Sequence, residues 1–99
     1  MPGYVVANYT ITNPEGYEPY VPAVVPTIVA AGGEILVADL ESESPEGDTG
    51  DVTVVLRFES KEAALAWYKS PEYAEAKPLR TENSEGVFMI TDGFVPPTA

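Results

Sequence analysis

The aromatic and cationic side chains of this chain concentrate in one segment, WYKSPEYAEAKPLR, at residues 67–80. Trp67, Tyr68, Tyr73 and Arg80 lie within it. A tyrosine hydroxyl can orient a ligand, and it can transfer a proton when a nearby cation lowers its pKa. Arginine recognises planar anions, although near a helix C-terminus it also stabilises the helix dipole. Core packing is the alternative interpretation for the aromatic residues.

A second arginine, Arg57, lies in an apolar run, VTVVLRF, at residues 52–58. A buried arginine is costly unless it is paired, so it requires an acidic neighbour or a bound anion. The structural interpretation is an ion pair with Glu34, Asp39 or another acid along the sheet. The functional interpretation is recognition of a carboxylate or an enolate by the guanidinium group.

Asn8 and several tyrosines complete the candidate set. Asn8 lies on the mixed face of a predicted strand, where its amide is either a satisfied polar group or a donor to a developing oxyanion. No two candidates have the sequence spacing of a known catalytic motif. The candidate catalytic residues are Asn8, Arg57, Tyr68 and Tyr73, and the candidate ligand-binding residues are Tyr4, Tyr17, Tyr20, Asp39, Trp67 and Arg80.

Composition excludes several kinds of chemistry. The 99 residues contain no Cys and no His, which removes thiol nucleophiles, disulfides, thiolate metal sites, the commonest general base and the usual haem ligand. We therefore predict no cofactor and no metal, and the acids of loop 41–51 do not have the spacing of a calcium-binding loop. A net charge of −11 repels nucleic acids and anionic membranes, so we predict neither as a partner.

The elements follow from periodicity and capping residues. Alternation predicts a strand at 4–11, with Tyr9 on its apolar face. The stretch at 13–31 has helical spacing, but Pro19, Pro22 and Pro26 lie inside it, so we expect a short or kinked first turn and regular helix mainly beyond Pro22. Asn13 is its predicted N-cap and Gly32-Gly33 its end. Strands at 34–40 and 52–58, the second of them central, flank the acidic loop. Ser60 and Ser70 cap two helical pieces, a last strand spans 86–93, and 94–99 is a tail.

This order predicts an α+β fold, a ferredoxin-like β-α-β-β-α-β sandwich within a single domain at 1–93. Its four-stranded antiparallel sheet has both helices on one face. The other face would expose Val6, Val55 and the neighbours of Phe88 or Met89 to water. We expect a second copy of the chain to cover it, with two sheets enclosing a barrel-like space. No membrane-length apolar run and no signal peptide are present, so a cytoplasmic location is expected.

The segments MPGYVVANYTITNPEGYEPY, GGEILV, PEGD and ALAWYKSPEYAEAKPLR resemble the bacterial family known as domain of unknown function 1330. That family belongs to the dimeric α+β barrel superfamily, and the resemblance runs from Met1 to about Gly93. It implies a homodimer with a cleft beside each sheet. Chain positions Glu34, Asp39–Leu40, Thr49 and Arg57 depart from the family pattern, and we expect them at the rim of a pocket.

Two functions remain open by analogy with the wider superfamily. The first is a protein that binds a small anionic or aromatic molecule between sheet and helices, as a cofactor-free monooxygenase, isomerase or cyclase. In that case Arg57 holds an anionic group, Asn8 donates to an oxyanion, and Tyr68 or Tyr73 transfers a proton. The alternative is a non-catalytic dimeric module whose barrel is filled by its own side chains.

Overall fold

The computed structural model describes residues 1–97. Its strands are β1 (Gly3–Ile11), β2 (Glu34–Asp39), β3 (Val52–Phe58) and β4 (Ser84–Asp92). Its helices are α1 (Pro14–Tyr17), α2 (Tyr20–Ala30), α3 (Lys61–Tyr68) and α4 (Pro71–Thr81). The predicted ferredoxin-like order is confirmed, with each of the two helical regions divided into two pieces.

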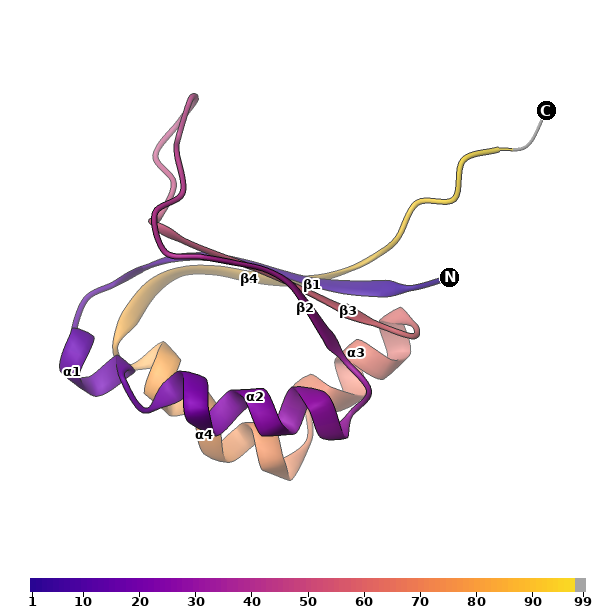
Figure 1. Ribbon diagram of the computed structural model, residues 1–99, viewed down its shortest axis with the longest axis horizontal. Helices are drawn as coiled ribbons and strands as arrows, with labels where there is room; N and C mark the ends of the chain where they lie inside the picture. Colours follow the sequence, from indigo (N-terminus) through magenta and orange to yellow (C-terminus); the bar gives the residue numbers. More distant parts are fainter. Residues whose placement is uncertain (98–99) are drawn as a thin grey trace.

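The strands form one antiparallel sheet in the order β2-β3-β1-β4, and the helices cover one face of it (Figure 1). The predicted central position of β3 is therefore correct. Along β1, Val5, Ala7 and Tyr9 are buried against the helices, whereas Val6 and Asn8 alternate with them on the other face. That second face, which no helix covers, is called the open face below.

Proline positions explain why the first helical region is divided. Pro19 precedes α2, and Pro22 lies in its first turn, where backbone N–H groups have no intrahelical partner in any case. Helix α2 thus begins slightly before the stretch beyond Pro22 that the sequence favours. Pro26 lies inside α2 and removes one of its hydrogen bonds. Gly32 ends the region with a φ of 79°, which favours glycine.

The predicted capping role of Asn13 is wrong. Its backbone is extended, but its side chain makes no hydrogen bond to the backbone of α1. Its amide instead donates to Oδ1 of Asn83 at 3.1 Å, and the backbone N–H groups of Thr12 and Asn13 donate to the Asn83 carbonyl. Asn13 therefore attaches the start of α1 to the end of the second helical region.

The two predicted serine caps of the second helical region are confirmed. The Ser60 hydroxyl accepts a hydrogen bond from the Ala63 N–H at 3.0 Å, and the Ser70 hydroxyl accepts one from Tyr73 at 3.2 Å. Ser70 also donates to the Trp67 carbonyl at 2.7 Å. This hydroxyl joins the end of α3 to the start of α4 and brings two aromatic residues, Trp67 and Tyr73, to the core.

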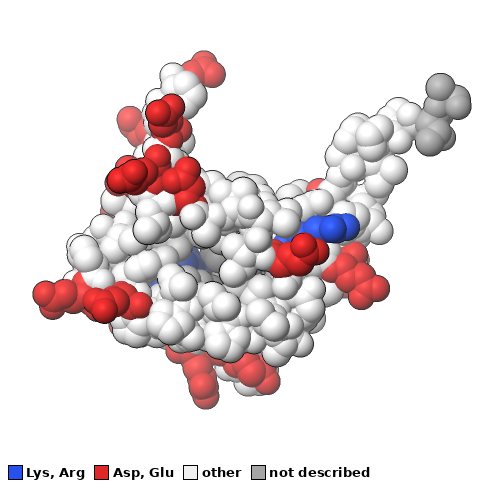
Figure 2. All heavy atoms as spheres, in the orientation of Figure 1, with Lys and Arg blue, Asp and Glu red and all other residues white. Residues whose placement is uncertain are grey.

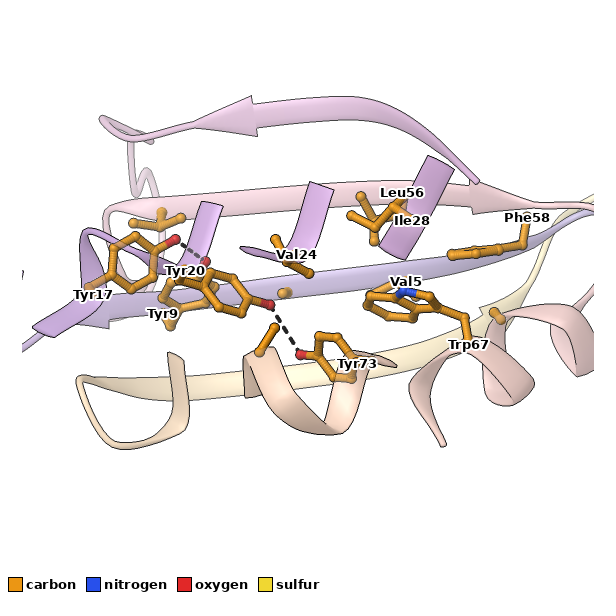
Figure 3. Packing of buried hydrophobic residues seen from close by; sticks show 14 residues of the cluster. Val5, Tyr9, Tyr17, Tyr20, Val24, Ile28, Leu56, Phe58, Trp67 and Tyr73 are labelled. Carbon is orange, nitrogen blue, oxygen red and sulfur yellow. Dashed lines mark hydrogen bonds between the residues drawn. The ribbon is translucent and has the colours of Figure 1, made fainter. Parts of the chain in front are cut away.

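The core lies between the sheet and the helices, and much of it is aromatic (Figure 3). Its larger buried members are Val5, Tyr9, Tyr17, Tyr20, Val24, Ile28, Leu56, Phe58, Trp67 and Tyr73. The Trp67 ring is 4.2 Å from Tyr73 and 5.5 Å from Phe58, measured between centroids. No helix among the described residues is long and apolar enough to cross a membrane.

Apolar side chains cross the open face from one sheet edge to the other. Val6 pairs with Val55 on β3 and with Met89 on β4, and Val55 in turn pairs with Val37 on β2. These four residues are called the open-face stripe. The acidic 41–51 hairpin and residues 94–97 both extend from the sheet on the side away from the helices (Figure 1).

Candidate functional site

A cavity of about 80 Å³ lies between α2 and the helix-facing side of the sheet. Its aromatic lining consists of Tyr9, Tyr17, Tyr20, Trp67 and Phe88. Its aliphatic lining consists of Ala7, Val21, Val24, Val25, Ile28, Ile35, Ala38, Val54 and Leu56. Val21 on α2 and Ile35 on β2 are substantially exposed, so the mouth opens between these two elements.

Local sequence patterns place the tyrosines at this cavity. Alternation along β1 directs Tyr9 toward the helices, opposite the direction of Asn8. Tyr17 ends α1 and Tyr20 begins α2, so the break between the helices sets their rings side by side, with centroids 5.4 Å apart. On the sheet, Phe88 pairs with Ala7 and shares its helix-facing direction.

The buried tyrosine hydroxyls form two pairs, drawn as dashed lines in Figure 3. The Tyr9 and Tyr17 oxygens are 2.7 Å apart, and the Tyr20 and Tyr73 oxygens are 3.1 Å apart. Burial is the main cause that raises the pKa of both Tyr9 and Tyr20 well above the usual range for tyrosine. Both hydroxyls therefore stay protonated at neutral pH and act as hydrogen-bonding groups, not as bases.

Arg80 is the buried cation of this region, with only 8% of its surface exposed. Its Nε and Nη2 groups donate to the Tyr73 hydroxyl at 3.4 and 3.3 Å, and its guanidinium carbon lies 4.3 Å from the Phe88 ring centroid. Burial opposes the charged form, but interactions with Tyr73 and Tyr20 outweigh it and raise the pKa of Arg80. The group is a permanent positive charge.

No carboxylate neutralises that charge within residues 1–97. The described residues contain one ion pair, between Arg57 and Glu34 at 3.7 Å, and it lies on the open face. Arg80 does not line the cavity itself, but its guanidinium group contacts Phe88, which does. Figure 2 shows Lys or Arg atoms deep within a hollow of otherwise uncharged surface.

The structure brings five of the candidate residues together. Tyr17, Tyr20 and Trp67 line the cavity, and Tyr73 and Arg80 lie directly behind it. A sixth candidate, Tyr68, packs against Tyr73 with centroids 5.5 Å apart but does not line the cavity. The Lys77 ammonium group instead lies over its ring, with Nζ 4.7 Å from the ring centroid.

The other four candidates, Tyr4, Asn8, Asp39 and Arg57, lie on the open face. The expectation that Arg57 is buried is wrong, since 48% of its side chain is exposed and Glu34 pairs with it. Neither Glu34, Asp39 nor Arg57 lines the cavity, so the departures from the family pattern at these positions do not form its rim. The reason is the direction of the strands: these side chains alternate with the ones that face the helices.

Asn8 has no free donor for a ligand. Its Nδ2 group donates to Gly50 O, Val52 O and Thr53 Oγ1, each at 3.1 Å, and its Oδ1 accepts from Gly50 N at 2.7 Å. The side chain therefore fastens the base of the 41–51 hairpin to β1. Of the two interpretations of Asn8 from the sequence, a satisfied polar group and an oxyanion donor, the structure therefore agrees with the first.

Sequence reasoning missed Tyr9 and Phe88 as site residues. Tyr9 was assigned to the apolar face of its strand, and a tyrosine at such a position is usually a core residue. The available signal was the hydroxyl itself, since a buried Tyr needs a partner where a Phe would not. The Trp67 indole N–H is not available to a ligand, because it donates to Thr27 Oγ1 at 3.0 Å.

Solved structures with this fold include proteins of unknown function and oxygenases. The RPA0582 protein of unknown function from Rhodopseudomonas palustris is 14% identical, with a TM-score of 0.74 over 96% of this chain and 84% of that one. SnoaB, a cofactor-independent oxygenase from Streptomyces nogalater, is 13% identical, with a TM-score of 0.62 over 99% of this chain and 95% of that one.

A putative antibiotic biosynthesis monooxygenase from Bacteriodes thetaiotaomicron is 16% identical, with a TM-score of 0.57 over 99% of this chain and 94% of that one. At such identities these likenesses establish the fold alone. No curated protein matches the sequence. Residues 2–94 match the family described as Domain of unknown function (DUF1330). The chain therefore belongs to the DUF1330 family, as its sequence motifs predicted.

Proposed function

We propose that this protein binds a small, largely apolar molecule in the cavity between α2 and the sheet and transforms it without a cofactor. The observation that carries this proposal is Arg80, a buried cation without an acidic partner among residues 1–97, placed behind a tyrosine-lined cavity. Removing an ion from water costs several kcal/mol even after the protein relaxes. A ligand that brings negative charge or oxygen acceptors offsets that cost.

The chemistry available at this cavity is stabilisation of a developing oxyanion. Preorganised donors in a dry site are worth more than the same donors in water. Tyr73 and Tyr20 connect Arg80 to the cavity by hydrogen bonds, so the positive charge is felt at the Tyr20 hydroxyl. This arrangement suits a monooxygenase, isomerase or cyclase reaction that proceeds through an enolate or a phenolate, and the likeness in fold to a cofactor-independent oxygenase supports it.

The proposed active form is a homodimer packed through the open faces of two sheets. The open-face stripe is apolar, and Val37 and Met89 within it are exposed in the single chain. A small protein seldom leaves such a patch in water. Closed two-fold symmetry lets the same patch cover itself, and the cavity of each chain remains on the opposite side of its sheet.

Replacing Arg80 with methionine tests the functional role of the buried charge. Methionine keeps an unbranched apolar side chain of similar length and removes the unpaired cation. We expect Arg80→Met to abolish the retention of small molecules while leaving the stability of ligand-free, refolded protein unchanged or higher. Native mass spectrometry and urea unfolding measure the two quantities.

Arg57→Met is the matched control, because it makes the same change on the open face. It should preserve ligand retention in full. A loss of about 3 kcal/mol or more in the stability of ligand-free Arg80→Met would contradict the proposal, because it would make Arg80 a structural residue of the core. The alternative function, a non-catalytic dimeric module with a filled interior, would then be favoured.

A further inference from the structure

The buried polar groups beside the cavity contain more hydrogen-bond donors than acceptors. Four tyrosine hydroxyls and one guanidinium group meet here, from Tyr9, Tyr17, Tyr20, Tyr73 and Arg80. Each of these side chains is more than nine-tenths buried. No carboxylate, amide or backbone carbonyl among residues 1–97 accepts a hydrogen bond from any of the four hydroxyls. Buried polar groups normally find partners, so this excess requires an explanation.

Arg80 sets the direction of the hydrogen bond between Tyr20 and Tyr73. A guanidinium group has five N–H donors and no acceptor. The Tyr73 oxygen accepts from both Nε and Nη2 of Arg80, which uses both of its lone pairs. The Tyr73 hydrogen must therefore be donated to the Tyr20 oxygen, 3.1 Å away. The hydrogen of Tyr20 is left without an acceptor among residues 1–97, and the ring of Tyr20 lines the cavity.

The pair formed by Tyr9 and Tyr17 leaves a second hydrogen unused. Two hydroxyls that share one hydrogen bond use only one of their two hydrogens, whichever oxygen is the donor. Both rings line the cavity, and Tyr17 lies beside Tyr20. Two hydroxyl hydrogens from neighbouring rings, one of Tyr20 and one of the Tyr9–Tyr17 pair, thus have no acceptor among residues 1–97. The surface that the cavity itself presents is almost wholly apolar, and the Trp67 N–H already donates to Thr27.

We propose that the ligand has an apolar body ending in two neighbouring acceptor oxygens that share a negative charge, as in a carboxylate or the enolate of a dicarbonyl compound. One oxygen accepts from Tyr20 and the other from the Tyr9–Tyr17 pair, and Arg80 balances the charge through Tyr73. This inference rests on the proposed function, since it specifies what the same cavity binds. A buried donor without an acceptor is costly, so each of the two ligand oxygens gains affinity by accepting one of these hydrogen bonds.

Cavity size sets the orientation of this ligand. An enclosed cavity of roughly 150 Å³ is known to hold one benzene molecule, and this one measures about 80 Å³. The oxygen-bearing end and the atoms next to it fit inside. The apolar body then lies in the mouth, against Val21, Val25 and Ile35. The ligand therefore enters with its charged end first.

Three compounds that share a ring and one additional carbon test the ligand class: benzoate, toluene and benzylammonium. Benzoate has two acceptor oxygens and a negative charge, toluene has no polar group, and benzylammonium has donors only. Trp67 is the single tryptophan of the chain and lines the cavity, so its fluorescence excited at 295 nm reports binding. We expect benzoate to bind at least tenfold more tightly than toluene, and benzylammonium more weakly than either.

Tyr20→Phe removes one free donor and should weaken benzoate binding about tenfold while leaving toluene binding unchanged. Tyr4→Phe is the control, because it makes the same change on the open face, away from the cavity, and should alter neither affinity. Circular dichroism establishes that each variant is folded. Should Tyr20→Phe fail to fold, Tyr17→Phe removes a donor from the other pair and is expected to have the same effect.

The outcomes separate this inference from the proposed function. Equal affinity for benzoate and toluene, or a preference for benzylammonium, would overturn the ligand class while showing that the cavity binds small molecules. An unchanged Trp67 spectrum with all three compounds, up to millimolar concentration, would overturn both. A benzoate preference that survives in Tyr20→Phe would remove Tyr20 from the site and overturn the assigned hydrogen-bond direction.

Discussion

Arg80 illustrates how a single residue can be costly for a fold and useful for a site. Its charge lies on the face of Phe88 and against the Tyr73 hydroxyl, so neutral groups hold it and no carboxylate among residues 1–97 neutralises it. Arg57, with a carboxylate partner and half of its side chain in water, incurs no comparable cost. Of these two arginines, Arg80, which has no acidic partner among residues 1–97, is the better candidate for ligand binding.

The buried tyrosines predict a loss of stability at high pH. Burial raises the pKa of Tyr9 and Tyr20 in the folded state, so between the unfolded pKa near 10 and the folded pKa the native chain holds more protons than the unfolded chain. Their contribution is complete below about pH 10 and is lost as the pH rises above it. Urea unfolding should show stability falling by up to about 1.4 kcal/mol per pH unit for each of the two tyrosines.

Tyr20→Phe provides the control for that pH dependence. Phenylalanine cannot ionise, so the slope above pH 10 should fall to about half of its wild-type value. Absorbance at 295 nm should show the corresponding tyrosines ionising only as the protein unfolds. An unchanged slope in Tyr20→Phe would contradict the burial of this hydroxyl.

At the scale of elements, Ser70 connects a capping interaction to the geometry of the site. Its hydroxyl accepts from Tyr73 N and donates to Trp67 O, so it fixes the angle between α3 and α4. Ser70→Ala should reduce stability by about 1 kcal/mol and also change the near-ultraviolet circular dichroism of Trp67. Thermal unfolding and circular dichroism measure these effects.

Ser60→Ala is the matched control for the Ser70 variant. Ser60 caps α3 through Ala63 N but lies at the other end of that helix from Trp67. The stability loss should be similar, and the tryptophan spectrum should stay unchanged. Identical spectra for both variants would mean that the helix junction does not position Trp67.

The elements were predictable from the sequence because each has a local signal. Alternation marks β1, the double glycine ends α2, and serine followed by proline restarts the second helical region at Ser70-Pro71. The position of the site was not predictable in the same way. Alternation correctly placed Asn8 on the mixed face and Val55 on the face without helices, but it could not show which face carries the cavity. The pocket predicted for Arg57 and Asn8 therefore lies on the other side of the sheet from them.

Local sequence patterns also could not show that the Arg80 side chain points into the core. Its position near the end of α4 agrees with an ordinary dipole interaction, and only the tertiary structure shows that its guanidinium turns inward toward Tyr73. The family resemblance included this residue in its most specific segment. The partners that make it unusual, Tyr73 seven residues away and Phe88 on β4, come together only in the fold.

At the scale of the whole molecule, the open-face stripe predicts self-association. Val55 is central in the stripe, beside Val6 and Val37. Val55→Glu places a charge in the proposed interface and should convert a dimer into a monomer in light scattering at micromolar concentration. Val29→Glu is the control, because Val29 is exposed on α2, which packs on the opposite side of the sheet. A wild-type monomer would contradict the interface.

The native mass spectrum of the purified protein is the most direct test of the central claim that the Arg80 cavity is a ligand site. The structure predicts a dimer that carries up to two copies of a discrete additional mass, lost in Arg80→Met and preserved in Arg57→Met. Soaking the wild-type protein in benzoate should restore an adduct where the natural ligand has been removed. A bare dimer that acquires no adduct from benzoate or toluene would contradict the claim and favour a filled, non-catalytic interior.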